Sequence, residues 1–276
     1  MIELPETYVL SEQINQTLTG KTVKNTIANG HPHTWAWFTG DPAEYPSKLN
    51  GQMISKASPG TGYTCGGNTE VFCGDQLLVI NTPVKYHAPG AKLPKTHQLL
   101  LEFTDGSYMS CTVQMWGGMF CFPLSGRRPD EYKENIKPDP YTDAFDEAYF
   151  DGLRRGVKPE LSVKAFLATE QRIPGFGNGV LHDTLWNARI HPKRKLNTMT
   201  DNDMLDLYHS VKSTLKAMRD DGGRDTERDL FGQPGGYRTI LSSKTLAYPC
   251  RACGGGLKRE AYMGGNIYFC PKCQAL

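Results

Sequence analysis

The sequence predicts a multi-domain α+β protein, and three features along the chain indicate this class. Short runs rich in Val, Ile, Thr, Tyr and Phe fill residues 21–122, and helical periodicity replaces them over residues 142–220. Two Cys-x-x-Cys pairs then occupy the last segment, residues 249–276. Strands followed by helices, without alternation, favour an α+β fold. A chain of 276 residues accommodates one large domain or two to three small ones.

The first part of the chain is predicted to form a β-sandwich or flattened barrel with one leading helix. Pro5 suits the first turn of that helix, which extends to about Leu18, and Gly20 suits its end. Asp105-Gly106 between two β-rich runs is the strongest hairpin signal in the chain. The predicted strands lie at residues 21–27, 76–80, 99–103, 108–114 and 119–122.

A polar stretch, residues 125–139, has the composition of an interdomain linker. After it, Thr200 and Asp203 predict a capping box at the start of the longest helix. We expect domains over residues 1–124, 140–232 and 233–276. The predicted helices lie at residues 142–155, 162–169, 179–188 and 200–220.

Composition limits where the protein acts and what it binds. No apolar run reaches the ~18 residues that a membrane span needs, and the N-terminus lacks a basic-then-apolar signal design. We therefore expect a cytoplasmic monomer without a membrane partner. Residues 1–150 hold 11 Lys and Arg against 16 Asp and Glu, whereas residues 151–276 hold 20 against 13. The basic second half suggests a surface that binds a polyanion, and chance segregation of solvated charges is the alternative.

The last segment is predicted to bind one structural zinc ion. Two Cys-x-x-Cys pairs separated by sixteen residues supply four thiolates, which make a closed tetrahedral site without an open position for water. Residues 257–262 and 266–269 would form a β-hairpin with Gly264-Gly265 at its tip. A disulfide or redox role is the alternative. The predicted ligands are Cys250, Cys253, Cys270 and Cys273, whereas Cys65, Cys73, Cys111 and Cys121 are interpreted as buried free thiols rather than a second metal site or a redox pair.

A glycine-rich turn, residues 171–178, separates two predicted helices and opens the second. Its glycines would let the backbone approach another group closely, and the free N–H groups of the following helix would bind a phosphate. Asn178 is predicted at the N-cap, where it could cap the helix or donate to that phosphate. A tight turn without a ligand is the alternative. The basic residues nearby indicate contact with a sugar–phosphate backbone: Lys164, Arg172, Arg189, Lys193, Arg194 and Lys195.

Several motifs occur in one order along the chain: MIELPE at the start, PGFGNG over residues 174–179, IHP over 190–192, PGGY over 234–237, and the four-cysteine segment ending in Cys273-Gln274. Together they resemble the formamidopyrimidine-DNA glycosylase/endonuclease VIII family. The resemblance runs nearly end to end and is most specific in the C-terminal half. It implies a β-sandwich, a helix–two-turns–helix (H2TH) domain and a zinc-finger hairpin that together grip damaged double-stranded DNA.

The resemblance also implies a chemistry. Family enzymes flip an oxidised base out of the duplex, cut its glycosidic bond through attack by the N-terminal amine on the sugar C1′, and nick the strand by β- or β,δ-elimination. Glu3 matches the glutamate that moves protons at the sugar, and Glu6 matches a second acidic position. Without the resemblance, both acids simply stabilise the first turn of a helix. Because Ile2 replaces the usual proline, the nucleophile is the amine of Met1 or, after its removal, that of Ile2.

Other family positions match incompletely. The loop that fills the space of the flipped base corresponds to Met115 and Trp116, which either enter the duplex or pack in the core. The phosphate-binding lysine of the β-domain has no clear match, although Lys56 and Lys85 lie nearby in sequence. The arginine near the hairpin tip falls at Gly265. We expect DNA contacts from Lys164, Arg172, Asn178, Gly179, Tyr237, Arg238 and Lys258.

Two functions therefore fit the sequence. One is a DNA repair glycosylase with a lyase step. The other is a binding protein that holds damaged DNA or structured RNA on the same scaffold without cutting bonds.

Overall fold

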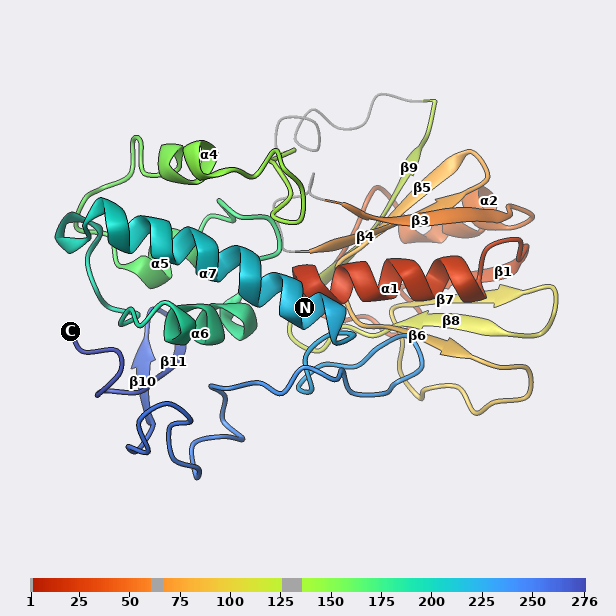
Figure 1. Cartoon of the computed structure of the whole chain (residues 1–276). Coiled ribbons are helices and arrows are strands. Elements are labelled where there is room, and N and C mark those ends of the chain that lie inside the picture. The colour runs from red at the N-terminus through yellow and green to blue at the C-terminus, as the bar shows by residue number, and fades with distance from the viewer. Residues whose placement is uncertain (1, 61–66, 126–135) are drawn as a thin grey trace.

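The computed structural model describes residues 2–60, 67–125 and 136–276. The chain forms two lobes, one built of β-sheets and one of helices, with the leading helix α1 (Leu4–Thr17) beside both (Figure 1). Helix α1 packs on strands β3 and β4 and also on the long helix α7. The four-cysteine segment lies below the helical lobe in this view.

The β lobe is a sandwich of two sheets, as predicted. Most neighbouring strands are antiparallel, and β2 runs parallel to β9. Strands β7 and β8 form the hairpin predicted at Asp105-Gly106. One sheet has the order β2 (Ala36–Phe38), β9 (Gly117–Pro123), β5 (Gln76–Ile80), β4 (Asn68–Cys73) and β3 (Ile54–Gly60). The other has the order β1 (Val23–Ala28), β7 (Leu99–Phe103), β8 (Tyr108–Cys111) and β6 (Val84–His87). A 3-10 turn (Pro42–Glu44) and helix α2 (Tyr45–Leu49) follow β2.

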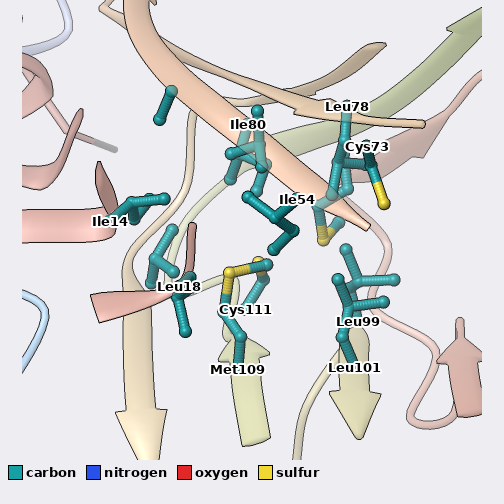
Figure 2. Packing of buried hydrophobic residues seen from close by; sticks show 14 of the residues in the cluster. Ile14, Leu18, Ile54, Cys73, Leu78, Ile80, Leu99, Leu101, Met109 and Cys111 are labelled. Carbon is teal, nitrogen blue, oxygen red and sulfur yellow. The ribbon is translucent and has the colours of Figure 1, made fainter. Parts of the chain in front are cut away.

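The core of the β lobe lies between the sheets and includes the inner face of α1. Figure 2 shows Ile14 of α1 and Leu18, its C-cap residue, beside Ile54 and Ile80 of one sheet, with Met109 of the other sheet close by. Among the remaining cysteines, the structure confirms buried free thiols at Cys73, Cys111 and Cys121, whereas Cys65 lies outside the described residues. Burial raises the pKa of the Cys73 thiol to about 12, so it packs as a small neutral side chain.

The helical lobe contains α4 (Glu147–Gly152), α5 (Val163–Ala168), α6 (Asn178–Asn187), a 3-10 turn (Leu196–Thr198) and α7 (Asp201–Asp220). The capping box is confirmed: the Thr200 side chain accepts from the Asp203 N–H and Asp203 accepts from the Thr200 N–H. The prediction of one helix over 142–155 is wrong, because Asp146 caps a shorter helix and the residues before it form turns. Residues 126–135 of the predicted linker lie outside the described residues.

The two hydrophobic cores share the start of the chain. Ile2 is buried in the core of the β lobe, and Leu4, two residues later, is buried in the core of the helical lobe. Leu230, far along the sequence, returns to the β core. The domain boundaries expected from the sequence stay a prediction. Across the described residues, none of the helices has the length and apolar character required to cross a membrane.

The last segment forms the expected hairpin from β10 (Lys258–Tyr262) and β11 (Gly265–Phe269). Its turn residues are Met263 and Gly264, both with positive φ. Two such residues between paired strands match the twist of a tight hairpin. The predicted tip, Gly264-Gly265, is therefore displaced by one residue, and Gly265 begins β11 instead.

Candidate active site

The carboxylate of Glu3 lies against the N-terminus of α6. Its two oxygens accept the backbone N–H groups of Gly179 and Val180 at 2.9 and 2.8 Å. The first N–H groups of a helix have no partner within the helix and attract an anion. The sequence predicted a phosphate at these N–H groups of α6. That prediction is wrong for Gly179, because Glu3 already occupies its N–H.

Arg224 holds the same carboxylate from the other side. It follows two glycines at the end of α7, and its side chain is almost fully buried. Its Nη1 lies 3.3 Å from Glu3, and its Nε and Nη2 donate to Glu6 at 2.9 and 2.8 Å. Burial alone would lower the pKa of Arg224, but the charges of Glu3 and Glu6 outweigh burial and raise it. One buried cation therefore lies between two buried carboxylates.

The glycines of the turn before α6 are required by these contacts. A Cβ at Gly177 would lie 2.4 Å from the Glu3 Oε1, and a Cβ at Gly179 would lie 1.4 Å from the Arg224 Nη1. Gly175 has a φ of +66° and touches the backbone of Gly67 in the β lobe. The predicted close approach exists, and the group approached is the Glu3–Arg224 pair.

The N-cap of α6 is Gly177, so Asn178 is its first helical residue and the prediction of Asn178 as N-cap is wrong. Gly177 has the extended backbone that an N-cap adopts, with φ −107° and ψ −172°. Asn178 instead directs its amide toward the hairpin of the last segment, where its Nδ2 would lie 3.4 Å from a Cβ at Gly265.

A pocket of about 320 Å³ opens beside the Glu3 carboxylate. Ligand sites in proteins commonly have volumes of about 300–1,000 Å³. Burial raises the pKa of Glu227, against the lowering effect of Arg224. Burial lowers the pKa of His182 to about 4, so its ring is neutral at pH 7. The wall is mostly polar and is formed by Glu3, Asn178, His182, Arg224, Thr226, Glu227, Thr239, Ser242, Ser243, Asn266 and Tyr268, with Gly179 and Leu241.

The structure describes only one of the two residues that were predicted to supply the nucleophilic amine. Met1 lies outside the described residues. The Ile2 side chain is buried in the β core, with 2% of its surface exposed. This burial anchors the chain immediately before Glu3, and the N–H of Leu4 donates to the carbonyl of Gly175 at 2.9 Å. The start of the chain is thus fixed on both sides of the Glu3 carboxylate.

Two of the predicted phosphate-contact residues, Lys164 and Asn178, converge beside Gly265. The Lys164 Nζ donates to the carbonyl of Tyr262 at 2.7 Å, and burial lowers the pKa of Lys164. A Cβ at Gly265 would lie 3.9 Å from that Nζ and 3.4 Å from the Asn178 Nδ2. An arginine at the position of Gly265 would therefore extend the same cluster. Its absence leaves Asn178 as the exposed donor there, and the predicted phosphate contact of Lys164 is wrong, because that side chain is only 2% exposed and bonds to the Tyr262 carbonyl.

Other predicted DNA contacts do not join this cluster. Arg172 donates to the carbonyls of Ala165 and Phe166 at the C-terminal end of α5, so it satisfies helix carbonyls instead. Burial raises the pKa of Tyr237, and the hydrogen bond between Tyr237 and Asp183 raises that pKa further. Arg238 and Lys258 are exposed and stay candidates for phosphate contacts.

Two of the predicted basic side chains after α6 are also occupied, whereas Arg189 and Lys195 are exposed. Lys193 pairs with Glu260 of the hairpin, and Arg194 pairs with Asp203 at 2.6 Å. The candidate β-domain lysine Lys56 lies over the Phe72 ring at 4.4 Å. These contacts stabilise the fold and leave fewer free cations than the sequence suggested.

The residues predicted to probe the lesion lie on the surface of the β lobe. Met115 is 71% exposed. Trp116 is half-buried, and its ring centroid lies 5.7 Å from that of Trp37. Trp116 therefore packs on a neighbouring tryptophan and is not part of the hydrophobic core.

The four cysteines of the last segment lie together as predicted. Their Sγ atoms are all within 4.8 Å of one another. Burial alone would raise the pKa of Cys250, but hydrogen bonds from the Ala252 backbone and the Trp186 indole lower it to about 6. A thiol that ionises near neutral pH suits a metal ligand. The segment is joined to the helical lobe by Gln274, which donates to the carbonyl of Ile190.

The fold and the site define a two-lobed protein with an H2TH domain, a four-cysteine hairpin and a glutamate near the chain start. Residues 136–228 match the family model of the formamidopyrimidine-DNA glycosylase H2TH domain. A formamidopyrimidine-DNA glycosylase of Mycobacteroides abscessus is 28% identical over 290 residues, covering 100% of this chain and 99% of that protein. One of Lactobacillus gasseri is 28% identical over 285 residues, with coverage of 100% and 99%.

Solved structures give the same likeness. Lactococcus lactis Fpg (MutM), in a complex with DNA containing N7-benzyl-Fapy-dG, has a TM-score of 0.84 and 22% identity, covering 99% of this chain and 100% of that chain. MutM (Fpg) of Thermus thermophilus has a TM-score of 0.79 and 20% identity, with coverage of 99% and 98%. Residues 136–228 therefore match the H2TH domain of formamidopyrimidine-DNA glycosylases, and the whole chain is similar to these enzymes.

Replacing Gly179 with alanine tests the packing of this site. The added methyl group would overlap the Arg224 guanidinium and force it from Glu3. We expect a loss of about 3–5 kcal/mol in the free energy of unfolding, the usual effect of breaking a buried ion pair, measured by urea denaturation. Gly152→Ala is the matched control, because nothing lies within 4 Å of its Cβ. Equal stability of the two variants would contradict the role given to Gly179.

Proposed function

We propose that this protein is a DNA repair glycosylase that removes a damaged, oxidised base and then acts as a lyase at the abasic site. The observation that carries the proposal is the position of the Glu3 carboxylate. It is fixed by the α6 N-terminus and by Arg224, and it borders a polar pocket next to the start of the chain. The relatives named as formamidopyrimidine-DNA glycosylases support the same activity.

In this mechanism the N-terminal amine attacks C1′ of the flipped nucleotide, the glycosidic bond breaks, and the base leaves with its bonding electrons and gains a proton. The attacking nitrogen loses a proton, the C1′–O4′ bond then breaks as O4′ gains a proton, and a protonated Schiff base forms between the nitrogen and C1′. Loss of a proton from C2′ of this Schiff base then expels the 3′ phosphate, which is β-elimination. An α-amino group has a pKa of roughly 7.7–8.0, so part of it is neutral at physiological pH. Glu3 would transfer protons at the sugar. The nucleophile is the amine of Met1 or, after its removal, that of Ile2, and either is a primary amine able to form the Schiff base.

Glu6 has a different proposed role from Glu3. Its carboxylate binds the Arg224 side chain and the Arg224 backbone N–H, and only 3% of its surface is exposed. Glu6 therefore positions Arg224, and Arg224 positions Glu3. Of these two glutamates, Glu3 borders the pocket and Glu6 does not. We assign proton transfer to Glu3 alone.

The substrate is proposed to be damaged double-stranded DNA. Solved structures of Lactococcus lactis Fpg are complexes with DNA that contains an abasic site and with DNA that contains an oxidised pyrimidine. Asn178, Arg238 and Lys258 would contact phosphates, so binding should weaken steeply with salt. A location inside the cell follows from such a substrate, and the monomeric state stays a prediction.

A binding protein without catalysis is the alternative, and it is not favoured. Burying a carboxylate costs free energy, and a protein that only binds DNA does not need a buried carboxylate. Here that carboxylate borders the pocket instead of lying sealed in the core. No contact among the described residues favours RNA over DNA.

Borohydride trapping tests the proposal. Reducing the protein in the presence of a duplex with an abasic site should leave a covalent protein–DNA adduct, because the Schiff base is converted to a stable amine. Glu3→Gln keeps the shape of the side chain and should lower base excision by at least about 100-fold, the usual contribution of general acid–base catalysis, with little change in DNA affinity. No adduct with the wild-type protein, or unchanged excision by the variant, would contradict the mechanism.

The four-cysteine site is proposed to hold one structural zinc ion. Four convergent sulfur atoms in a closed arrangement suit tetrahedral zinc and leave no position for a substrate. The metal would join the two turns of a segment that otherwise has few apolar side chains. It would also fix the hairpin that carries Tyr262 and Gly265 against Lys164.

Removing the metal should weaken DNA binding without unfolding the whole protein. We expect one zinc per chain by elemental analysis, and Cys253→Ala should lose it together with at least tenfold of the affinity for any duplex. Thermal unfolding of the β lobe core should change little, because the described residues that form that core include none of the segment. A metal-free wild-type protein, or full affinity in the variant, would contradict this assignment. Cys121→Ala, which removes a buried thiol elsewhere, is the control.

A further inference from the structure

A groove follows one exposed face of the long helix α7. Its volume is about 560 Å³, within the range of about 300–1,000 Å³ that ligand sites commonly have. Among the described residues, those that line this groove differ from those that line the pocket beside Glu3. We call it the α7 groove, and its lining residues are Pro140, Tyr141, His209, Lys212, Ser213, Lys216, Arg219 and Asp220.

The α7 groove lies on the side of α7 that faces away from α6. The side chains of Ser210 and Thr214 hydrogen-bond to α6 at 2.7 and 2.8 Å. Successive residues of a helix are about 100° apart around its axis. Lys212 and Lys216 each follow one of these two residues by two positions, so they lie on the opposite face. Because the N-terminus of α6 holds Glu3, a ligand in the α7 groove would leave the Glu3 pocket open.

Arg219 is held flat at one end of the groove by two tyrosine rings. Its guanidinium carbon lies 4.4 Å from the ring centroid of Tyr8 and 5.2 Å from that of Tyr141. The Tyr141 hydroxyl donates to the carbonyl of Leu215 at 2.8 Å, which fixes this ring on α7. In the described parts of the chain, no carboxylate pairs with Arg219. A cation stacked on aromatic faces keeps its N–H groups free at the edge, so Arg219 is positioned to bind an anion.

The groove as a whole is positively charged. Of the described residues that line it, Lys212, Lys216 and Arg219 are cations at pH 7 and Asp220 is a carboxylate. Lys216 pairs with Asp220, but an exposed pair of this kind contributes little and opens easily. Lys212 donates to the carbonyl of Thr142 at 3.0 Å and keeps its charge at the wall of the groove. Charge complementarity therefore selects an anionic ligand.

The cationic stretch is too short for a long polyphosphate chain. His209 and Arg219 are ten residues apart, which is about 15 Å along a helix. Exposed carboxylates follow at both ends: Asp206 lies one turn before His209, and Asp220 comes directly after Arg219. A continuous nucleic-acid backbone would extend past the cations and meet these carboxylates. An extended peptide of about four or five residues covers the same 15 Å at about 3.3 Å per residue.

We propose that the α7 groove binds a short acidic segment of a partner protein. Carboxylates of that segment would contact Arg219 and Lys216, and one apolar side chain between them would pack on Pro140 and Tyr141. The planar Arg219 guanidinium can bind a carboxylate through two parallel hydrogen bonds, which favours a peptide acid over a simple ion. The inference does not depend on the proposed function. The partner would bind while the Glu3 pocket is occupied.

The test uses the full chain and a fluorescein-labelled peptide, EEFEE, followed by fluorescence anisotropy at low ionic strength. The wild-type protein should bind it with a Kd below about 1 mM, and added salt should weaken binding. Lys216→Glu should lower the affinity at least about tenfold, because like charges then face each other. Arg219→Lys keeps the charge but loses the two parallel hydrogen bonds, so its affinity should fall between those of the wild type and Lys216→Glu.

Lys48→Glu is the matched control. Lys48 is a helix lysine of the β lobe that pairs with Glu44 one turn away, as Lys216 pairs with Asp220, so its charge reversal should leave peptide binding unchanged. The peptide EEAEE should bind more weakly than EEFEE, because it lacks the apolar side chain, and KKFKK should not bind. Base excision by Lys216→Glu should equal that of the wild type. Melting temperatures identify any variant that fails to fold, and Lys216, with 72% of its side chain exposed, gives the variant that decides the question.

Four outcomes would overturn the inference. The first is no binding of EEFEE by the wild-type protein up to about 1 mM. The second is equal affinity in folded Lys216→Glu or equal binding of EEAEE. The third is displacement of EEFEE by a single-stranded decanucleotide, which would assign the groove to nucleic acid. The fourth is a dimer in sedimentation that Lys216→Glu converts to a monomer, which would assign it to a second copy of this chain. A protein that binds EEFEE as described but excises no base would contradict the proposed function and leave this inference intact.

Discussion

The rest of the structure depends on one buried ionic contact, in which Arg224 lies between the carboxylates of Glu3 and Glu6. Each charge would be costly to bury alone. Together with the N–H groups at the start of α6, the three charges satisfy one another. Because Glu3 and Glu6 belong to the first helix and Arg224 follows the last long one, this contact joins the beginning of the chain to the helical lobe.

This contact explains why the first residues hold a fixed position, although chain termini are often poorly ordered. Ile2 enters one hydrophobic core and Leu4 the other, which leaves Glu3 at the boundary between the lobes. The glycines before α6 then let the helix N-terminus reach the Glu3 carboxylate. A chain start held in this way presents the Glu3 carboxylate to the pocket. Pre-organisation of this kind favours proton transfer to a nucleotide brought into that pocket.

Features encoded by neighbouring residues could be predicted from the sequence. The Asp105-Gly106 hairpin, the Thr200–Asp203 capping box and the four-cysteine cluster each depend on short spacings, and all three are present. The helix boundary at Gly177 was missed by one residue, because a glycine with extended backbone served as N-cap in place of the polar residue after it. The helix predicted over 142–155 is shorter in the structure, because Asp146 is its N-cap and the helix therefore begins later than expected.

Features made by distant residues could not be predicted. Arg224 contacts Glu6 across 218 positions of sequence, and nothing near Arg224 distinguishes a buried cation from a solvated one. For the same reason, basic residues such as Arg172 and Arg194 looked free in the sequence, although the structure pairs them with carbonyls and with Asp203. Trp35 and Trp37 gave no signal either, since only the parallel pairing of β2 with β9 brings them to Trp116.

The central claim is that Arg224 and the two carboxylates stabilise the site as one unit. A double-mutant cycle of Arg224→Gln and Glu6→Gln, read by urea unfolding at pH 7, measures it most directly. Each single variant leaves a buried charge without its partner, so the account predicts that the double variant is more stable than the sum of the single losses implies, by at least about 2 kcal/mol. Losses that add to within about 0.5 kcal/mol would mean that the two side chains act independently, and would contradict the account.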